Sequence, residues 1–584
     1  MSPSDPTGGD FDAIVVGSGI SGGWAAKELT EKGLRTLLLE AGPPIVPARD
    51  YVEHVQAYSL PYRGYGNLRK LHSEQPIQSQ TGNCDEWGSK FFVNDRDNPY
   101  DNDPDKPFCW IRGRHVGGRS TMWGRQVYRW SDLDFEANAK EGIAVDWPIR
   151  YADIAPWYSY VEKFIGVSGE AEGLAQLPDG EFLPPMALNC AESIFTAASK
   201  SLGWSTTHRR LAQLTRMHNN RPPCHYCGNC VNGCDVGAMF NTVAVTLPPA
   251  LKTGNLDVLT DCVVASVRMD QENRARGVTY IERYTMKAVE VDAKYVILAA
   301  STLENTRLML LSAKGGLGNS SGLLGHYMMD QVGGGGVSGI LPKLRGGPSR
   351  LDDGKSAGIT IPNFQNIDQK TARKDFIRGY VMNATGGQTE YPQYAASVPG
   401  YGSAWKKEIK SRYVAQARVW NAGAEMLARK ENFVELDPEV KDHWGIPVLK
   451  IHFTHSDNDR KLIADFQQKA EELFRKAGGE VIAGFARGGP AGFPGGPGSP
   501  GAGEGGRRDT LSGAIHEVGT ARMSVDPKEG VLNSFCQTHD IPNLYVFGGN
   551  SFPSTGDKHP TLTMMALSAR GCDHLLEQAK GRRA

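Results

Sequence analysis

The sequence has no long uninterrupted apolar run and almost no excess of charge. Its 584 residues include 64 lysines and arginines against 65 acidic residues, a formal net charge of -1. A protein that grips nucleic acid usually presents a strong positive field, so this balance argues against a nucleic-acid partner. No apolar run approaches the roughly 20 residues that a membrane-spanning helix needs. We therefore expect a globular protein with no nucleic-acid partner and no direct membrane span.

Export and haem signals are also missing. The first residues contain neither a basic leader nor an apolar signal core, so we expect no signal peptide of the chain's own. No Cys-x-x-Cys-His motif for haem attachment occurs, so any cytochrome would be a separate partner. What is present is a hydrophobic content of 40% in a long chain, which predicts more than one domain.

The N-terminal segment carries the strongest local pattern. Residues 12–16 are apolar and indicate a buried strand, residues 17–22 read Gly-Ser-Gly-Ile-Ser-Gly, and residues 23–32 have helical periodicity. A second apolar strand at 35–39 ends at Glu40, 18 residues beyond the third glycine. This order of strand, glycine turn, helix, strand and acid is typical of a dinucleotide-binding fold.

The three glycines of this turn have separate tasks. Gly17 makes the tight turn, Gly19 lets the backbone approach a pyrophosphate, and Gly22 allows helix and strand to pack closely. The helix start offers free N–H groups to the phosphates, and Glu40 would meet the ribose hydroxyls. This pattern alone does not separate FAD from NAD.

Three later segments extend the pattern. Residues 112–121 contain a second glycine pair, Gly117 and Gly118, in a polar stretch. Residues 294–302 and 543–550 read as strands that end in small residues. A parallel sheet beneath a long bound cofactor would need such strands.

The order of these pieces, together with His516–Met523 and His559–Leu567, resembles the glucose-methanol-choline (GMC) family of FAD oxidoreductases. The resemblance implies an α/β fold with a Rossmann-like FAD-binding domain and a discontinuous α+β substrate-binding domain built on an antiparallel sheet. The ranges implied are 9–130, 215–310 and 507–584 for the FAD-binding domain, and 131–214 and 311–506 for the substrate-binding domain.

The same resemblance implies how the flavin is held. Some relatives attach FAD through a histidine just after the second glycine pair, but residues 120–123 here read Ser-Thr-Met-Trp, so non-covalent FAD is expected. The cofactor-binding residues implied are Gly17, Ser18, Gly19, Gly22, Glu40, Gly117, Gly118, Ser120, Thr121, Ala300, Gly549, Asn550, Pro560 and Thr561.

Two histidines occupy the places where the family has its catalytic groups. Alcohol oxidation needs a base for the hydroxyl proton, and imidazole, with an ordinary pKa of about 6.5, suits that task. The resemblance implies that His516 is this base and that His559, 43 residues later, hydrogen-bonds the substrate oxygen. Pro560 suits the first position of a helix, and helical periodicity then runs to Glu577.

Four of the ten cysteines crowd into eleven positions, at Cys224, Cys227, Cys230 and Cys234. Their C-x-x-C-x-x-C-x-x-x-C spacing is that of a bacterial ferredoxin run and indicates an iron–sulfur cluster rather than a disulfide framework. Zinc is the alternative, although structural zinc usually takes ligand pairs from two separated turns. Asp235 stands where ferredoxins have proline, and the spacing alone leaves a three-iron or a four-iron cluster open.

The cysteine segment resembles the iron–sulfur-containing catalytic subunits of bacterial FAD-dependent glucose dehydrogenase and glucoside 3-dehydrogenase. That resemblance favours a 3Fe-4S cluster over 4Fe-4S. A one-electron carrier is useful only if electrons leave the protein, so we expect a dehydrogenase. The resemblance further implies a cytochrome c acceptor, a small subunit that carries the export signal, and a periplasmic place of work, with a cytoplasmic one as the alternative.

Three functions remain open. The favoured one oxidises the C3 hydroxyl of D-glucosides to 3-keto sugars by hydride transfer to flavin N5. The second is a FAD-dependent glucose 1-dehydrogenase or another polyol or aldonate dehydrogenase. The third is a non-catalytic flavin and iron–sulfur electron-transfer subunit, which the presence of both His516 and His559 disfavours. The glycine- and proline-rich tract 483–506 is expected to form a surface loop.

Overall fold

The computed structural model describes most of the chain. The described residues are 10–51, 55, 59, 66–81, 84–228, 230, 233–348, 358–386, 395, 398–484 and 515–581. Of the tract 483–506, only the first two residues are described, as the end of a strand, and the rest lies outside the described residues. Across the ranges just given, no helix is both long and apolar enough to cross a bilayer.

The first sheet has the topology of a dinucleotide-binding fold. β1 (Phe11–Val16) lies between β2 (Thr36–Leu39) and β10 (Ala288–Leu298), and both pairings are parallel. β2 is buried at every residue, which explains its continuous apolar sequence. The strand order is β7-β2-β1-β10-β9-β8, with β18 also paired to β10, where β7 is Leu256–Leu259, β8 Cys262–Met269, β9 Ala275–Glu282 and β18 Leu544–Val546.

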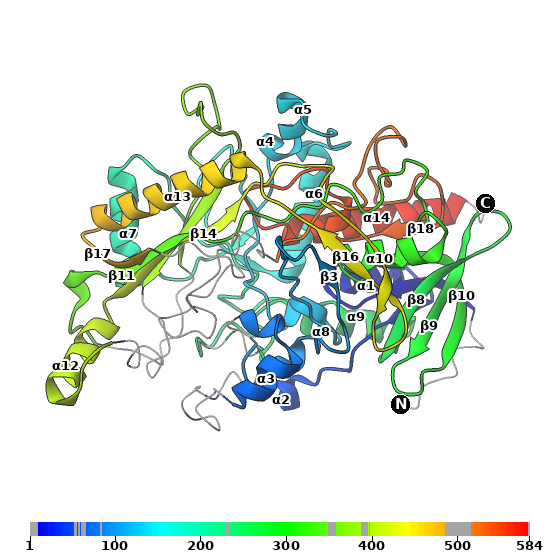
Figure 1. The fold of residues 1–584 in the computed structure, drawn as a ribbon, viewed down its shortest axis with the longest axis horizontal. Helices are drawn as coiled ribbons and strands as arrows, with labels where there is room; N and C mark the ends of the chain where they lie inside the picture. Colours follow the sequence, from blue (N-terminus) through cyan, green and yellow to red (C-terminus); the bar gives the residue numbers. More distant parts are fainter. Residues whose placement is uncertain are drawn as a thin grey trace.

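Helices from distant parts of the sequence cover this sheet. α1 (Ile20–Glu31) packs on β1 and β2 and also on α14 (Thr561–Gly581), which in turn packs on α6 (Tyr151–Ile165). Figure 1 shows α14 crossing the right-hand half of the molecule close to α1. α10 (Thr302–Ser312) lies on β8. The N-terminal and C-terminal segments therefore build one unit.

The second sheet is antiparallel and has the order β17-β11-β14-β13-β12-β6. Two helices, α7 (Cys190–Ser201) and α13 (Asp457–Lys476), pack on it. α13 buries Leu462, Phe466 and Phe474 while its other side stays charged, so it covers one face of the sheet only. The strands are β17 Glu480–Gly484, β11 Gly336–Ile340, β14 Gln416–Ala424, β13 Tyr380–Gly386, β12 Ile359–Ile361 and β6 Thr207–His208.

Shorter elements connect the two sheets. A third sheet has the order β15-β16-β3, and β4 pairs with β5. Their bounds are β3 Asp101–Asn102, β4 Val167–Ser168, β5 Phe182–Leu183, β15 Phe433–Lys441 and β16 Pro447–His452. The other described α-helices are α2 Pro47–Asp50, α3 Leu68–Glu74, α4 Asp132–Phe135, α5 Ala137–Glu141, α8 Thr242–Val245, α9 Leu247–Lys252 and α12 Gly402–Tyr413. Two short 3-10 helices, η6 Gly118–Thr121 and η9 Gly549–Ser551, contain residues that were predicted to bind the cofactor.

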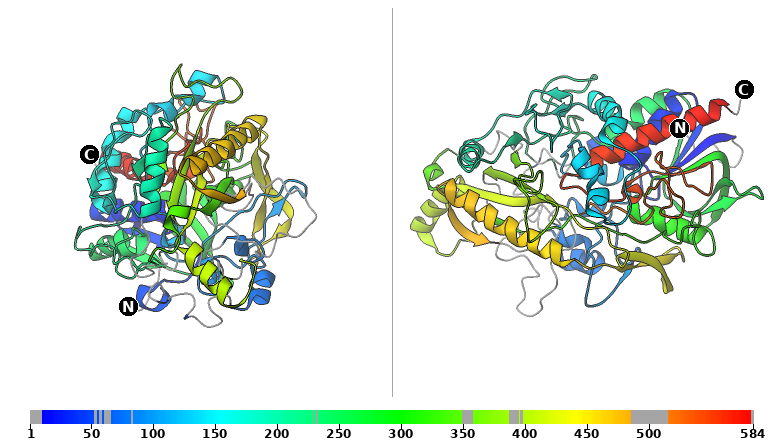
Figure 2. Two further views of the ribbon diagram at one scale, coloured as in Figure 1. Left: turned by 90° about the vertical axis from the view of Figure 1, so that its left-hand side faces the viewer. Right: turned by 90° about the horizontal axis from the view of Figure 1, so that it is seen from above.

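The fold class predicted from the sequence is confirmed. A Rossmann-like, mostly parallel sheet with its helices forms one end of the molecule, and the antiparallel sheet with α7 and α13 forms the other. The right-hand view of Figure 2 separates them along the long axis, with α13 in gold towards one end and α14 in red towards the other.

Candidate active site

The first glycine turn leaves β1 as the sequence predicts. Gly17 has a φ of +95°, which favours glycine, and its N–H donates to the Leu39 carbonyl at 2.8 Å. A Cβ on Gly22 would lie 1.8 Å from the Gly17 oxygen, so any side chain there would force the helix away from the turn. A Cβ on Gly19 would meet no protein atom within 4 Å. The open side of the turn is therefore at Gly19.

Glu40 lies beside this turn at the end of β2 and is 5% exposed. One carboxylate oxygen accepts from the N–H and the hydroxyl of Ser18, at 3.1 and 2.6 Å, and the other accepts from the Gly42 N–H at 2.9 Å. Burial raises the pKa of Glu40, and these hydrogen bonds oppose that rise. A buried acid thus stands where a dinucleotide fold holds its ribose.

The second glycine pair lies directly against the first turn. The Gly117 N–H donates to the Ser18 hydroxyl at 2.9 Å, and a Cβ on Gly118 would lie 3.5 Å from the Gly19 Cα. The short helix η6 that follows is held by the Ser120 hydroxyl, which accepts from the Thr242 N–H at 3.1 Å. Segments that are about a hundred residues apart in sequence therefore form one cradle.

The remaining cofactor-site residues border this cradle or lie at the start of α14. A Cβ on Gly17 would lie 2.8 Å from the Ala300 Cα. The buried Asn550 accepts from the Asn305 side chain at 3.0 Å, while its own Nδ2 has no hydrogen-bond partner among the described residues. Thr121 Oγ1 lies 2.9 Å from His115 Nε2, and the Gly549 carbonyl accepts a hydrogen bond from the Gly519 N–H at 2.9 Å. The Pro560 carbonyl accepts from the Met564 N–H at 2.9 Å, in the first turn of the helix that begins at Thr561.

These observations fit a bound dinucleotide. The glycine turn is open on one side, the ribose position carries a buried acid, and a buried amide donor is left for a ligand to satisfy. The described structure brings the two glycine turns, Glu40 and Ala300 into contact, and the role of these residues in holding FAD stays a prediction.

The two histidines also meet. The rings of His516 and His559 lie 4.8 Å apart, centroid to centroid, at an angle of 70°. His516 belongs to a segment that is tied to the second glycine pair, because Arg119 of η6 forms an ion pair with Glu517 at 2.9 Å. His559 directly precedes Pro560 and α14. The pair therefore stands at the edge of the cradle.

The hydrogen bonds of Gln331 fix the protonation of His516. The Gln331 side-chain N–H group donates to the carbonyls of Gly556 and Lys558, at 2.6 and 2.9 Å. Its oxygen must therefore face His516 Nδ1, 2.7 Å away, and accept a hydrogen bond from the Nδ1–H group. With Nδ1 protonated, Nε2 of the neutral ring has a free lone pair.

A second glutamine orients His559. The Gln126 oxygen accepts from Tyr128 at 3.0 Å, Asn383 at 3.1 Å and Arg209 at 3.3 Å. Its N–H group therefore points at His559 Nε2, 3.1 Å away, which must be the acceptor. The proton of the neutral His559 ring is then on Nδ1.

Both imidazoles are neutral over the physiological range. Burial, helped by the Arg119 cation, lowers the pKa of His516 to about 3. Burial also lowers the pKa of His559, with smaller contributions from His516 and Arg209. A neutral His516 with a free Nε2 can accept a proton from a hydroxyl group.

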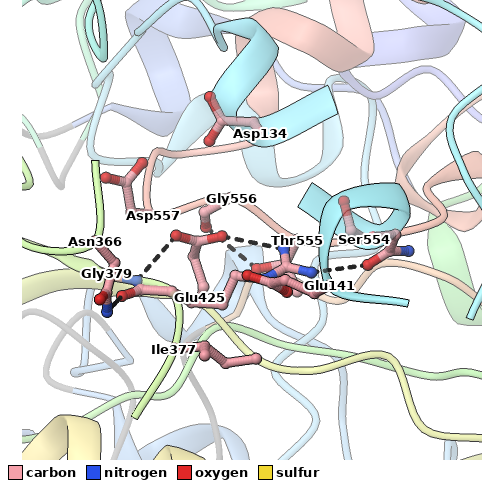
Figure 3. A network of polar contacts seen from close by, with 12 residues as sticks. Asp134, Glu141, Asn366, Ile377, Gly379, Glu425, Ser554, Thr555, Gly556 and Asp557 are labelled. Atoms are coloured by element: carbon pink, nitrogen blue, oxygen red, sulfur yellow. Dashed lines mark hydrogen bonds and ion pairs between the residues drawn. The ribbon is translucent and has the colours of Figure 1, made fainter. Parts of the chain in front are cut away.

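A buried network of charges lies behind the pair. Lys558, next to His559, forms ion pairs with Asp134 at 2.9 Å and with Asp557. Figure 3 shows Glu425 below these two aspartates in this view, bonded to the Gly379 backbone N–H at 3.0 Å. Burial and the two aspartates raise the pKa of Glu425 to about 8, although a nearby arginine opposes the shift. Glu425 therefore keeps its proton to a higher pH than an ordinary glutamate does.

The four cysteines lie in one partly buried segment. Cys224 and Cys234 pack against the same apolar cluster, and each sulfur accepts a backbone N–H, from Tyr226 at 3.3 Å and from Met239 at 3.5 Å. Within the part of the chain that the structure describes, however, no three histidine, cysteine or acidic side chains are arranged so that they could hold a metal ion. The cluster predicted at these cysteines therefore stays a prediction.

Gln126 and Gln331 could not have been found from the sequence. Neither belongs to a glycine turn, a histidine motif or a cysteine run, and each reaches its histidine from a different part of the fold.

Comparison with known proteins agrees with this geometry. Residues 11–333 match the N-terminal model of a family described as GMC oxidoreductase, and residues 428–568 match the C-terminal model of the same family. The chain resembles the pyridoxine 4-oxidase from Mesorbium loti with a TM-score of 0.61, at 16% identity and over 97% of this chain and 99% of that one. At that identity the structural likeness shows the fold alone.

Three relatives are similar over nearly their whole length. They are 2-methyl-1,2-propanediol dehydrogenase of Mycolicibacterium austroafricanum, 27% identical over 97% of this chain and 95% of the relative; the fructose dehydrogenase large subunit of Gluconobacter japonicus, 26% over 97% and 98%; and the gluconate 2-dehydrogenase flavoprotein of Pantoea cypripedii, 25% over 97% and 94%. With its cradle, its histidine pair and a family match over more than half its length, the chain belongs to the GMC oxidoreductase family, whose cofactor is FAD.

Proposed function

We propose that this protein is a dehydrogenase that oxidises a hydroxyl-bearing carbon of a sugar or glycoside with non-covalently bound FAD. The observation that carries the proposal is the pair of neutral imidazoles at the edge of the cradle, one with a free Nε2 and one with a protonated Nδ1. Bound FAD would supply the hydride acceptor. The relatives act on a diol, on fructose and on gluconate by their names, which supports a polyhydroxylated substrate.

The residues divide the work as follows. The glycines of both turns, with Glu40, Ala300 and Asn550, hold FAD. The substrate hydroxyl donates its proton to His516 Nε2, while His559 Nδ1–H bonds the same oxygen. One proton of the substrate would then stay on His516, and bound FAD would accept the hydride, that is, two electrons and one proton, from the carbon.

A substitution of His516 tests this assignment. We expect His516→Gln to lower kcat/KM by about a hundredfold or more while flavin content stays the same. The control His452→Gln removes a partly exposed histidine outside the site and should change neither quantity. If His516→Gln is as active as the wild type, His516 is not the base.

We further propose that electrons leave through an iron–sulfur cluster, favoured as 3Fe-4S, held by Cys224, Cys227, Cys230 and Cys234. The ferredoxin-like spacing and the N–H groups on two of the sulfurs support it. Iron and acid-labile sulfide analysis tests the cluster, and low-temperature EPR of the oxidised protein separates 3Fe-4S from an EPR-silent low-potential 4Fe-4S. A purified protein without iron and sulfide would refute this part alone.

The proposed acceptor is a cytochrome c-type protein, and the proposed location is the periplasm, in a complex with a small subunit that carries the export signal. One relative is named as a large subunit and another as a flavoprotein, which supports a complex. Purification of the protein from its native source tests the complex: a small subunit and a c-type cytochrome should co-purify with it. We also propose the division into domains: residues 9–130, 215–310 and 507–584 form the FAD-binding domain, and residues 131–214 and 311–506 form the substrate-binding domain.

The carbon that reacts can be identified with a dye acceptor. We favour C3 of D-glucosides over C1 of glucose. Methyl glucoside and sucrose have no oxidisable C1, so activity on them supports C3, and activity on glucose alone supports C1. Activity on sorbitol alone would indicate a polyol dehydrogenase. Flavin without oxidation of any sugar would favour an electron-transfer subunit.

A further inference from the structure

One face of the antiparallel sheet is polar where it meets the histidine pair. Asn383 of β13 pairs with Trp420 of β14, and Thr385 pairs with Arg418. Because side chains alternate along a strand, these four share a face. The residues between them, such as Ala384 and Val419, are fully buried. Asn383 donates to Gln126, which bonds His559, so the polar face is turned towards the site.

Two arginines stack on Trp420 at this face. The Arg209 guanidinium carbon lies 5.3 Å from the ring centroid, and that of Arg418 lies 4.5 Å from it. Arg209 also donates to Gln126 at 3.3 Å. A single amide group therefore separates Arg209 from His559.

The Arg418 side chain makes no hydrogen bond or ion pair with any described residue, although it is partly buried. Burial and the neighbouring Arg209 lower its pKa to about 10. Two buried arginines have carboxylate partners: Arg129 pairs with Glu162 at 2.6 Å, and Arg210 pairs with Glu172 at 2.7 Å. A partly buried cation that has no acidic partner among the described residues and lies beside a second cation is unfavourable by itself, and a bound anion would relieve the repulsion.

We propose that the substrate carries an anionic group, a carboxylate or a phosphate, which Arg418 and Arg209 bind while a hydroxyl of the same molecule reaches His516 and His559. The inference rests on the proposed function and narrows its substrate to an acidic sugar or sugar phosphate. The planar fork of arginine donates two parallel hydrogen bonds to such a group, and Trp420 holds both guanidiniums in place.

Matched substrates test the proposal. Methyl glucuronoside differs from methyl glucoside only by a carboxylate at C6, and glucose 6-phosphate differs from glucose only by a phosphate. With a dye acceptor we expect kcat/KM of an anionic member to exceed that of its neutral partner by about tenfold or more, and this advantage to shrink at high ionic strength. Whichever pair shows the effect identifies the anion. If both neutral members are equally good or better, the proposal is wrong.

A variant assigns the effect to Arg418. In Arg418→Gln, the ratio of anionic to neutral kcat/KM should fall about tenfold, and Arg418→Lys should retain part of it. The control Arg475→Gln removes an exposed arginine from α13 and should change neither the ratio nor the activity. An unchanged ratio in Arg418→Gln overturns the proposal.

Calorimetric titration of the same sugars keeps this inference separate from the proposed function. Tighter binding of the anionic member to the wild type, lost in Arg418→Gln, supports the anion site even if no sugar is oxidised. Oxidation of neutral sugars with no preference for anions leaves the proposed function intact and refutes the anion site.

Discussion

At the scale of single residues, the two histidines receive their roles from two glutamines. Gln331 accepts from His516 Nδ1 because its own N–H group is engaged by two carbonyls, at 2.6 and 2.9 Å. Gln126 donates to His559 because three donors occupy its oxygen. His516 can therefore accept a hydrogen bond at Nε2, whereas His559 can donate one from Nδ1.

Replacing Gln331 should therefore impair catalysis without a direct contact to substrate. We expect Gln331→Leu to lower kcat/KM by about tenfold to a hundredfold, because His516 can then rotate or protonate on the wrong nitrogen. Steady-state kinetics and flavin absorbance measure the effect, and the pH profile should flatten or shift. Gln467→Leu, which removes a partly buried glutamine on α13, is the control. Equal losses in both variants would point to general destabilisation.

The pH profile follows from the lowered pKa of His516. A base with a pKa of about 3 stays deprotonated far below the ordinary value of 6.5. We expect kcat/KM for an uncharged substrate to stay constant down to about pH 5. Arg119→Gln removes a cation beside the ring, so the pKa of His516 and the acid limb should both move up. An acid limb already at the ordinary imidazole value in the wild type would contradict this.

Sequence reasoning reaches some residues and not others at this scale. Gly17, Glu40, His516 and His559 lie in short motifs whose spacing is set by local geometry, so they could be predicted. Arg418 has no such motif. It becomes visible only when the register of β13 and β14 places it opposite Thr385, on the sheet face that carries Asn383.

At the scale of elements, β10 shows what apolar patterning can and cannot detect. Its second half is buried between β1 and β18, and this half was predicted. Its first half, residues 288–292, pairs antiparallel with β9 and alternates between exposed and buried residues, so no apolar run marks it. α14 likewise ends at Gly581, a turn beyond the predicted Glu577.

The glycine turn before α1 allows a paired test. In Gly22→Ala, the new methyl group would collide with the Gly17 carbonyl, so we expect loss of bound flavin and destabilisation by about 1–3 kcal/mol. In Gly19→Ala, the methyl group meets no protein atom within 4 Å, so stability should persist while flavin is lost. Thermal unfolding and absorbance near the flavin maximum separate the two effects. Full flavin in Gly19→Ala would mean that the cofactor does not approach this position.

At the scale of the whole molecule, the site exists only where the two sheets meet. Gln126 and Asn383 join the antiparallel sheet to His559, and Gln331 joins His516 to the loop before α14. The buried charges around Lys558 lie in the same junction. Catalysis and the stability of this junction are therefore linked.

The stability of the junction should depend on Glu425. Its pKa in the folded protein is about 8, whereas the ordinary value is 4.5. Between pH 4.5 and pH 8, the folded protein therefore keeps a proton on Glu425 that the unfolded chain has released. The free energy of unfolding therefore falls as the pH rises from about 4.5 through about 8. Glu425→Gln removes this dependence, so its stability relative to the wild type should rise with pH. Urea unfolding of the variant and the wild type at about pH 5 and about pH 9 measures this change. Glu472→Gln, at a more exposed glutamate, is the control. If the stability difference between Glu425→Gln and the wild type is the same at both pH values, the raised pKa of Glu425 is wrong.

β1 and β18 are neighbours of the same strand, β10, which spreads the flavin site over almost the entire order of synthesis. A ribosome that has already made the first glycine turn still has Asn550 and His559 to add. Cofactor loading thus has to wait until translation is nearly over. A chain that stops before β18 would lack Asn550, His559 and α14, so we expect it to bind no flavin.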